Sequence, residues 1–584
     1  MRKIKVILIL VSVFIQSCIS FARAGINIPG KDSVSADFNE RLCVFTDRNL
    51  YITGEKILFS AVVVKSPSMN EYDWSKIIYA ELISSNGIPV SQAKYPVRNR
   101  MATGYLLIPQ DILTGFYYMK LYTRWMRNFP AGYYTWVRIK IINPFQKDIE
   151  KWKKNISETA EFENQMPLNN TPLKIICQTD KSVYGKHEKV NISLAVPFIR
   201  YQVRPDIYCI TVTSPYATET AEYGINLVPD VERARNYSLN FVPDIRGLSL
   251  SGRVIDKNTG NGVYQSHVRI SVLGKKTDYS SYISLLDGTF LFALEPFVGT
   301  SDMYITADPS ENMSLDILVD KEYSNENHSF SNLPFTLDEK ERITATGFML
   351  NTQIEKSFIR KIRVEASDTG KNELRYFYGN PVSTIYIDDY IKLPNLDEVI
   401  FELIHDVSLI RRNGSYYLRS NNKFTDLEIY KPLIMIDNIP VSDVGAMLRM
   451  TPEKIERIEV VDRIYAKGDI LFGGILNLIS KKGDVAGIDL PKNSYFFNYE
   501  GFAKQDTVSF PEYEIQPENT RIADVRNCLY WNPSVSIQQD PVDLSFYTSD
   551  KTGQYIILVR GVTDRGTIVE GKCYFSVENK NQTK

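Results

Sequence analysis

The chain contains stretches in which apolar and polar residues alternate, and these stretches predict β-strands joined by short turns. The segments "LFSAVVV" (Leu58–Val64) and "VNISLAV" (Val190–Val196) are rich in β-branched residues, and their alternation is typical of strands buried on one face. Each segment follows a turn, which Gly54 supplies in the first case and the pair Gly185 and Lys186 in the second. We therefore expect a strand, turn and strand at both places.

These two segments belong to an internal repeat. Thr179 follows Thr46 by 179 − 46 = 133 residues, and five residues recur at this offset. They are Thr46, Asp47, Tyr51, Glu55 and Lys56, which return as Thr179, Asp180, Tyr184, Glu188 and Lys189. The pattern T-D-x-x-x-Y-x-x-G-E resembles the second macroglobulin domain of the α2-macroglobulin family. That resemblance implies seven-stranded β-sandwiches of roughly 100 residues, which we expect over residues 38–145 and 173–245.

A different β pattern lies within residues 246–380. Strand-like segments at Leu248–Gly274 and Leu285–Leu294 are separated by Asn/Gly and Asp-Gly turns. The segment meets a pattern G-x-V-x-D-x-x-T-G at Gly252, Val254, Asp256, Thr259 and Gly260. It resembles the carboxypeptidase-regulatory-like sandwich. Residues 308–380 contain further strand-like runs to which no module is assigned.

Residues 381–487 combine helical and strand patterns. Leu396, Val399, Ile400, Leu403 and Ile404 recur at helical spacing, and "IERIEVV" and "GILNLIS" predict two closing strands. The region resembles the plug domain of TonB-dependent receptors, and the pair Gly473 and Gly474 matches the glycines before the last strand of that family. A Cβ atom at either glycine is expected to prevent the close approach of a neighbouring strand.

The resemblance to a plug raises the question of the barrel that a plug normally fills. A barrel of 22 strands needs well over 200 residues, since each strand takes about 9 to 11. Only 584 − 484 = 100 residues follow Asp484. The predicted fold is therefore mainly β, with several β-sandwich (macroglobulin or Ig-like) domains in a row, one small α+β plug-like domain and no transmembrane barrel. Residues 488–584 are expected to form a C-terminal β-sandwich, and residues 146–172 a linker.

The first residues predict export. Arg2, Lys3 and Lys5 precede the apolar run Val6–Ile15, which is too short to span a bilayer, so residues 1–24 resemble a signal peptide. Cleavage after Ala24 competes with a lipobox interpretation in which Cys18 carries a lipid. Removing residues 1–24 leaves a charge of 64 − 69 = −5, which does not favour nucleic acid or anionic lipid. No other segment is expected to span a membrane.

Five cysteines remain after Cys18, and an odd number leaves at least one thiol unpaired within the chain. Cys528 and Cys573 both fall in strand-like segments of the predicted C-terminal sandwich. Because export permits oxidation, we expect a disulfide between them. The other cysteines are expected to be buried and free.

Residues that would support catalysis are missing from the sequence patterns. Only four histidines occur, and no zinc-protease, nucleophile-elbow or P-loop spacing is found. The C-x-E-Q thioester motif of some macroglobulins is absent around every cysteine. We expect no catalytic residue, metal site or cofactor. An aromatic loop with Trp125, Phe129 and Tyr133 is either a contact surface for a protein or glycan, or the cover of a sandwich core.

The order of these modules resembles a group of exported envelope proteins of Gram-negative bacteria, in the periplasm or at the outer membrane. The leading hypothesis is a non-enzymatic scaffold whose plug-like domain or aromatic loop docks on an envelope partner such as an outer-membrane transporter. The alternatives are a carbohydrate-binding accessory protein for nutrient uptake and a macroglobulin-like protease trap without a thioester.

Overall fold

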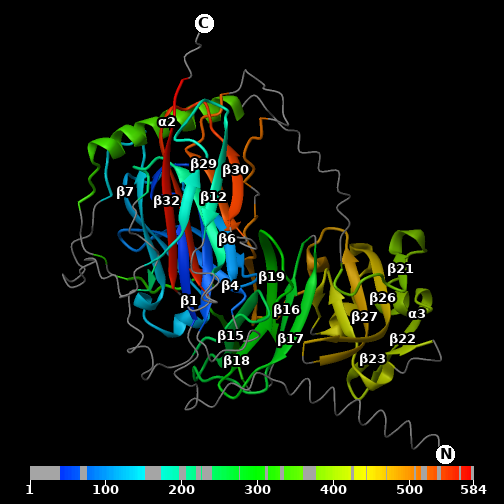
Figure 1. Cartoon of the computed structure of the whole chain (residues 1–584). Coiled ribbons are helices and arrows are strands. Elements are labelled where there is room, and N and C mark those ends of the chain that lie inside the picture. The colour runs from blue at the N-terminus through cyan, green and yellow to red at the C-terminus, as the bar shows by residue number, and fades with distance from the viewer. Residues whose placement is uncertain are drawn as a thin grey trace, which may run out of the picture. The chain divides into compact units, whose positions relative to one another are not determined.

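The computed structural model of the chain shows strands and helices over most of its length (Figure 1). The residues that it describes are 40–65, 75–150, 172–195, 205–218, 225–226, 240–274, 276–308, 313–328, 330, 334–359, 376–421, 427–441, 443–468, 470–505, 508–513, 523–535, 541–563 and 567–579. The predicted signal peptide, Cys18 and most of the predicted linker lie outside these ranges.

The chain divides into two compact units, each of which is built from segments that are far apart in the sequence. Unit 1 comprises residues 1–245, 325–361 and 506–584, and unit 2 comprises residues 246–324 and 362–505. Both units are mainly β, with several pairs of sheets, so the predicted fold class is confirmed.

The first β-sandwich of unit 1 consists of a three-stranded sheet in the order β1-β3-β6 and a larger sheet in the order β14-β8-β7-β4-β5. The short strand β2 adds to the larger sheet by pairing with β8 in parallel. The strands are β1 (Glu40–Thr46), β2 (Leu50–Ile52), β3 (Lys56–Lys65), β4 (Ile77–Ser84), β5 (Pro89–Pro96), β6 (Met101–Leu107), β7 (Gly115–Tyr122), β8 (Thr135–Ile142) and β14 (Ile225–Asn226).

Residues 325–361 return to unit 1 and cover the first sandwich. The Phe330 ring stacks on Tyr118 of β7 with centroids 3.7 Å apart. After it, helix α2 (Glu339–Ile359) packs Phe348 against Leu50. This cover helps to explain why β7 is buried along its whole length, which a strand of a sheet exposed on one face would not be. The sequence pattern did not reveal α2.

The second β-sandwich of unit 1 draws its strands from both ends of the chain. Its smaller sheet has the order β10-β12-β30, and its larger sheet the order β11-β32-β31-β13-β29, with β9 pairing with β32 in parallel. The strands are β9 (Leu173–Lys174), β10 (Ile176–Thr179), β11 (Val183–Tyr184), β12 (Lys189–Ala195), β13 (Pro205–Thr213), β29 (Cys528–Val535), β30 (Val542–Tyr547), β31 (Gly553–Thr563) and β32 (Ile568–Val577).

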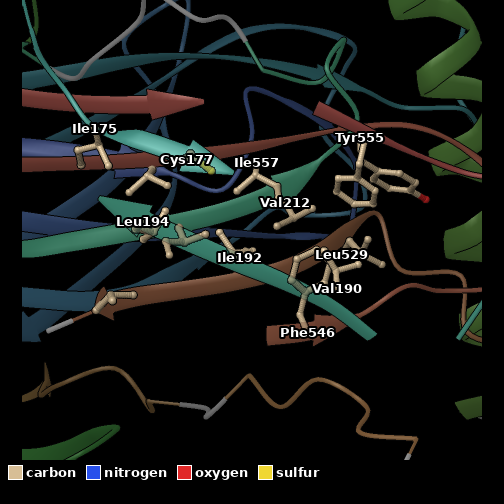
Figure 2. Packing of buried hydrophobic residues seen from close by; sticks show 14 of the residues in the cluster. Ile175, Cys177, Val190, Ile192, Leu194, Val212, Leu529, Phe546, Tyr555 and Ile557 are labelled. Carbon is tan, nitrogen blue, oxygen red and sulfur yellow. The ribbon is translucent and has the colours of Figure 1, made fainter. Parts of the chain in front are cut away.

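The core of the second sandwich mixes residues from its two halves. Figure 2 shows Ile192 and Leu194 of β12 in one cluster with Leu529 and Ile557, which lie more than 330 positions later in the sequence. All four side chains are buried. Neither half therefore has a closed core without the other.

The two sandwiches share one topology, strand for strand. The eight strands β1 to β8 of the first sandwich correspond in order to eight strands of the second, which are β10, β11, β12, β13, β29, β30, β31 and β32. Corresponding strands have the same neighbours in the sheets. In both sandwiches the second of the eight strands pairs in parallel with the last. In the first sandwich residues 85–88 join the fourth and fifth strands, whereas in the second sandwich residues 214–527 do so. Unit 2 is thus inserted in one strand connection of the second sandwich.

This topology corrects the domain assignment. The predicted sandwiches at 173–245 and 488–584 are the two halves of one sandwich, and not separate domains. The sequence pattern identified strands in both segments, but strand patterns do not show which strands pair over long separations.

The repeated residues form the same hydrogen-bond network in both sandwiches. In the first sandwich the Asp47 carboxylate accepts hydrogen bonds from Tyr51 Oη at 2.7 Å and from Leu58 N at 2.9 Å. Glu55 accepts from Arg48 Nη1 at 3.2 Å and from the backbone N–H of the residue after Tyr51 at 2.7 Å. Burial is the largest factor that raises the pKa of Tyr51, so its hydroxyl stays protonated and donates.

The second copy repeats each of these contacts at the offset of 133 residues. Asp180 accepts from Tyr184 Oη at 2.6 Å and from Asn191 N at 2.9 Å. Glu188 accepts from Lys181 Nζ at 2.5 Å, and its other oxygen accepts from the N–H after Tyr184 at 2.6 Å. The repeat is therefore a structural motif that fixes the turn before the third strand, because each carboxylate ties three neighbouring chain segments.

Unit 2 contains a third β-sandwich, with sheets in the orders β18-β15-β20 and β17-β16-β19-β28. Asp256 closes the turn in the G-x-V-x-D-x-x-T-G pattern, because its carbonyl accepts from Gly260 N at 2.8 Å and its carboxylate from Thr259 Oγ1 at 3.0 Å. The strands are β15 (Ser249–Asp256), β16 (His267–Val272), β17 (Asp278–Ile283), β18 (Thr289–Ala293), β19 (Thr300–Ala307), β20 (Leu315–Val319) and β28 (Ser494–Glu500). The strand β28 lies in the segment predicted to be the C-terminal sandwich, which is a second correction.

The rest of unit 2 is an α+β lobe, which we define as residues 376–488. Its five-stranded sheet has the order β21-β26-β27-β24-β25, and a hairpin, β22-β23, stands apart from it. The elements are β21 (Ser383–Tyr386), α3 (Leu396–Leu403), β22 (Val407–Arg412), β23 (Ser415–Ser420), β24 (Leu433–Ile436), β25 (Ile439–Pro440), α4 (Val444–Leu448), β26 (Ile455–Lys467) and β27 (Ile470–Ser480). The lobe has its own core, in which α3 packs on the sheet.

The glycine pair in β27 lies where other backbone segments come close. A Cβ atom at Gly473 would lie 2.3 Å from Leu427 O, and one at Gly474 would lie 2.7 Å from Val461 O. Gly474 also has φ +86°, a conformation that disfavours a branched side chain. The strand β26 is bulged opposite this point, between Val461 and Ile464.

The predicted disulfide between Cys528 and Cys573 is wrong. Both residues lie in the same sheet, but two strands, β13 and β31, separate β29 from β32. At about 4.8 Å per strand step the Cα atoms are roughly 14 Å apart, well beyond the limit of about 7 Å for a disulfide. Cys573 lies instead beside Cys177.

We predict that a chain ending at Gln505 loses the second sandwich, because its core then lacks four strands. Limited trypsin digestion should cut at Lys189 within β12, while Arg269 in β16 of unit 2 stays protected. The full-length chain is the control and should resist cleavage at both sites. Protection of Lys189 in the shortened chain would show that residues 506–584 form a domain of their own.

We also predict that Gly474→Val lowers the free energy of unfolding of the α+β lobe by about 3 kcal/mol or more, because it combines a strained φ with a backbone clash. Hydrogen exchange should show the lobe opening while both sandwiches of unit 1 keep their protection. Gly483→Asn is the matched control, since Gly483 has φ +65° and no atom within 4 Å of the added Cβ. Equal stability of the Gly474→Val and Gly483→Asn chains would contradict the proposed close approach.

Candidate functional site

The aromatic loop between β7 and β8 does not form an exposed surface. Trp125 and Tyr133 are 6% and 5% exposed, and only Phe129 is half-buried. The three rings pack on one another, with centroids 6.2 Å apart for Trp125 and Phe129 and 5.2 Å apart for Phe129 and Tyr133. The prediction of a protein or glycan contact is therefore wrong for Trp125 and Tyr133.

Hydrogen bonds hold this loop against the sandwich. Asn128 Oδ1 accepts from the backbone N–H groups of Asn240 and Phe241 at 2.7 and 2.8 Å, and Asn128 Nδ2 donates to Phe241 O at 2.7 Å. Trp136 Nε1 donates to Ala131 O at 2.9 Å. Residues 240–241 thus cover the loop, so the alternative of a core cover describes its buried aromatic residues better. Nothing in the sequence indicated that residues 240–241, which are far from the aromatic loop along the chain, would cover it.

Exposed apolar side chains are concentrated elsewhere, in residues 382–402 of the α+β lobe, which we name the docking segment. Ile391 and Phe401 are 82% and 83% exposed, and Val382, Tyr386 and Tyr390 are each about half exposed. Large apolar side chains that are this exposed are typical of surfaces that bind a partner when they occur together.

The backbone of the docking segment is fixed by the core of the lobe. Val382 N donates to Val460 O at 2.7 Å, and β21 continues this pairing with β26. Helix α3 begins at Leu396 because Asn395 caps it, with its side-chain oxygen accepting from Glu398 N at 2.9 Å. Tyr386 of β21 and Phe401 of α3 therefore project from regular elements, which reduces the entropy cost of binding, whereas Ile391 lies in the connection between them.

The periodicity of α3 explains the exposure of Phe401. Leu396, Val399 and Ile400 point into the core of the lobe and are buried. Phe401 falls on the opposite face. The predicted helix at these residues is present, but the position of Phe401 outside the apolar period is the signal that our sequence analysis missed.

The docking segment is acidic. It contains five acidic residues and one lysine, a net charge of 1 − 5 = −4. The acidic residues are Asp388, Asp389, Asp397, Glu398 and Glu402. Asp388 forms an ion pair with Lys481 at 2.7 Å, and Lys392 forms one with Glu453 at 2.8 Å. Lys481 and Glu453 lie outside the docking segment and carry opposite charges, so the two pairs leave the net charge at −4.

Two further observations concern the chemistry of the described chain. Among the residues that the structure places, no three His, Cys, Asp or Glu side chains gather as metal ligands would. Within the same ranges, no helix has the length and hydrophobicity needed to cross a membrane.

Comparisons with known proteins give distant structural similarities alone. No protein family and no characterised protein matches the sequence. The α2-macroglobulin of Salmonella, as a structure reacted with methylamine, matches at 8% identity and a TM-score of 0.22, over 94% of this chain and 40% of that protein. The native α2-macroglobulin of E. coli matches at 8% identity and a TM-score of 0.23, over 95% and 40%.

A third similar structure is the dimeric latent PorU of Porphyromonas gingivalis, at 8% identity and a TM-score of 0.16, over 48% of this chain and 34% of that protein. The chain thus spans about two fifths of the length of the two macroglobulins.

Proposed function

We propose that the protein is a non-enzymatic, exported scaffold of the cell envelope whose α+β lobe docks on a protein partner with a basic, apolar surface. The observation that carries this proposal is the docking segment, where Ile391 and Phe401 are exposed among acidic side chains. Aromatic residues such as phenylalanine are enriched at the cores of protein interfaces.

The electrostatics of the docking segment favour a basic partner. A net charge of −4 within 21 consecutive residues, 402 − 382 + 1, attracts positive charge and repels acidic surfaces. The attraction speeds encounter, while burial of Phe401 and Ile391 supplies most of the affinity. Binding should therefore weaken as salt rises, because exposed charges are screened beyond about 10 Å at 0.1 M.

The lobe is suited to docking because one face of its sheet has a core made of lobe residues alone, while the other face is fixed by packing on Tyr279 of the third sandwich. Its resemblance to a plug domain in sequence motivates the further proposal that the partner is an outer-membrane protein, such as a transporter. The signal peptide predicted at residues 1–24, with lipid attachment at Cys18 as the alternative, motivates the proposal of an envelope location.

The structure gives less support to the two alternative functions, carbohydrate binding and protease trapping. A carbohydrate-binding role was based on the aromatic loop, and two of its three rings are buried. A protease trap would require an exposed bait segment that is cut before a change of shape, and nothing in the described chain favours one.

We predict that Phe401→Asp with Ile391→Asp lowers affinity for the partner about thirtyfold or more, since a single hot-spot residue contributes about 2 kcal/mol. Folding should be unaffected, because exposed positions change stability by about 0.5 kcal/mol or less. A photo-crosslinker placed next to Phe401, at Glu402, in intact cells identifies the partner, and the affinity of that partner is then measured in vitro.

Leu286→Asp is the matched control, since Leu286 is 79% exposed in the third sandwich, outside the docking segment. Full binding by the double variant together with loss in the control would move the contact surface to the third sandwich. Crosslinking to a second copy of this chain, or to glycan alone, would contradict the proposed partner class.

A further inference from the structure

Two cysteines that are far apart in the sequence lie next to each other in the second sandwich. Cys177 Sγ of β10 and Cys573 Sγ of β32 are 2.7 Å apart. The two strands belong to different sheets, so these thiols face each other across the sandwich. Cys177 is buried and lies in the cluster shown in Figure 2, and Cys573 is partly exposed.

A close approach of the backbone brings these thiols together. Strand β9 pairs with β32, and Ile175 N donates to Glu570 O at 2.8 Å. A Cβ at residue 571 would lie 2.7 Å from Ile175 O, so Gly571 allows this contact where another residue would push the strands apart. The chain then continues for two residues on each side and places Cys177 over Cys573.

The environments of the two thiols differ, and the difference indicates which thiol attacks an oxidant first. The hydrogen bond to Cys573, with burial, raises the pKa of Cys177. The same hydrogen bond is the main factor that lowers the pKa of Cys573, so Cys573 is the thiol that ionises first. It is also the more accessible of the two.

The remaining described cysteines lack these features. Burial raises the pKa of Cys209 to about 11, and it raises the pKa of Cys43 and Cys528 to about 12. Such thiols are poor nucleophiles at neutral pH.

We propose that Cys177 and Cys573 form a disulfide that covalently closes the second sandwich. The oxidant is a disulfide compound, R–S–S–R, such as a thiol oxidoreductase of the envelope or glutathione disulfide. The Cys573 thiolate attacks one sulfur of R–S–S–R, forms a mixed disulfide and releases R–S⁻, which takes up a proton. Cys177 then loses its proton and attacks Cys573 Sγ, releasing the second R–S⁻. Two protein thiols are oxidised and one disulfide is reduced to two thiols, so electrons and protons balance.

This bond would enclose residues 178–572, and with them all of unit 2, in one covalent loop. It would therefore hold the two halves of the second sandwich together even when unit 2 is pulled by a partner. The inference does not depend on the docking segment, because it concerns a different part of the chain.

The first test counts thiols in the intact chain. The reduced protein is treated with glutathione disulfide, denatured and alkylated, and its mass is measured. We expect two fewer alkylated thiols than in the reduced control, a peptide pair that joins Cys177 to Cys573, and reversal by dithiothreitol. An unchanged thiol count, or a disulfide between any other pair, overturns the proposal.

The second test separates the attacking thiol from the resolving thiol. Cys177→Ala should accumulate one glutathione as a mixed disulfide at Cys573, whereas Cys573→Ala should react about tenfold more slowly at Cys177. Cys209→Ala, at another buried position of the same sandwich, should still form the disulfide. Faster glutathionylation of Cys573→Ala than of Cys177→Ala overturns the assigned order of attack. If a variant fails to fold, the thiol count on the unaltered chain still tests whether the disulfide forms.

Discussion

The antiparallel pairing of β13 with β29 and β31 is the constraint on which the rest of the molecule depends. Thr211 of β13 lies opposite Trp531 on one side and Leu558 on the other, although hundreds of residues separate it from both. The buried core of the second sandwich forms only when these strands are together. Everything between residues 214 and 527 is therefore fixed at both of its ends to adjacent strands of one sheet.

The repeated Asp, Tyr and Glu residues support this arrangement from the first sandwich. Glu55, whose oxygens already accept from Arg48 and from the backbone, also accepts from Asn527 Nδ2 at 2.7 Å, immediately before β29 begins. Thr211 Oγ1 donates to Asp47 O at 2.9 Å. This network of the first sandwich thus contacts β13 and the residue just before β29, and residues 214–527 connect these two strands. The copy in the second sandwich lies nearer the solvent, since Lys181 is 53% exposed where Arg48 is 4% exposed.

The sequence revealed the local structure well and the long-range structure poorly, for physical reasons. The repeat at Asp47 and Asp180 was visible because the same hydrogen bonds need the same side chains at the same spacing. The pairing of Cys177 with Cys573 was not, because alternation along a strand shows which face is buried but not which distant strand lies next to it. The exposed Phe401 was predictable from the helical period, whereas the burial of Trp125 and Tyr133 required knowledge of the covering segment at residues 240–241.

An inserted unit between two adjacent strands has a mechanical consequence for a scaffold. A force applied to unit 2 acts on neighbouring strands of a single sheet, and the second sandwich must resist it as one cooperative unit. That cooperativity would allow the α+β lobe to carry a partner without loosening the body of the protein. It also means that the two halves of the second sandwich have no separate stability.

Native-state hydrogen exchange at low denaturant tests this claim most directly. The amides of β12 and β13 and those of β29, β31 and β32 should open with one common free energy and the same denaturant dependence, because they share one core. If β31 and β32 kept their protection under conditions in which β12 and β13 exchange freely, the C-terminal strands would form a domain of their own, and the closed sandwich described above would be contradicted.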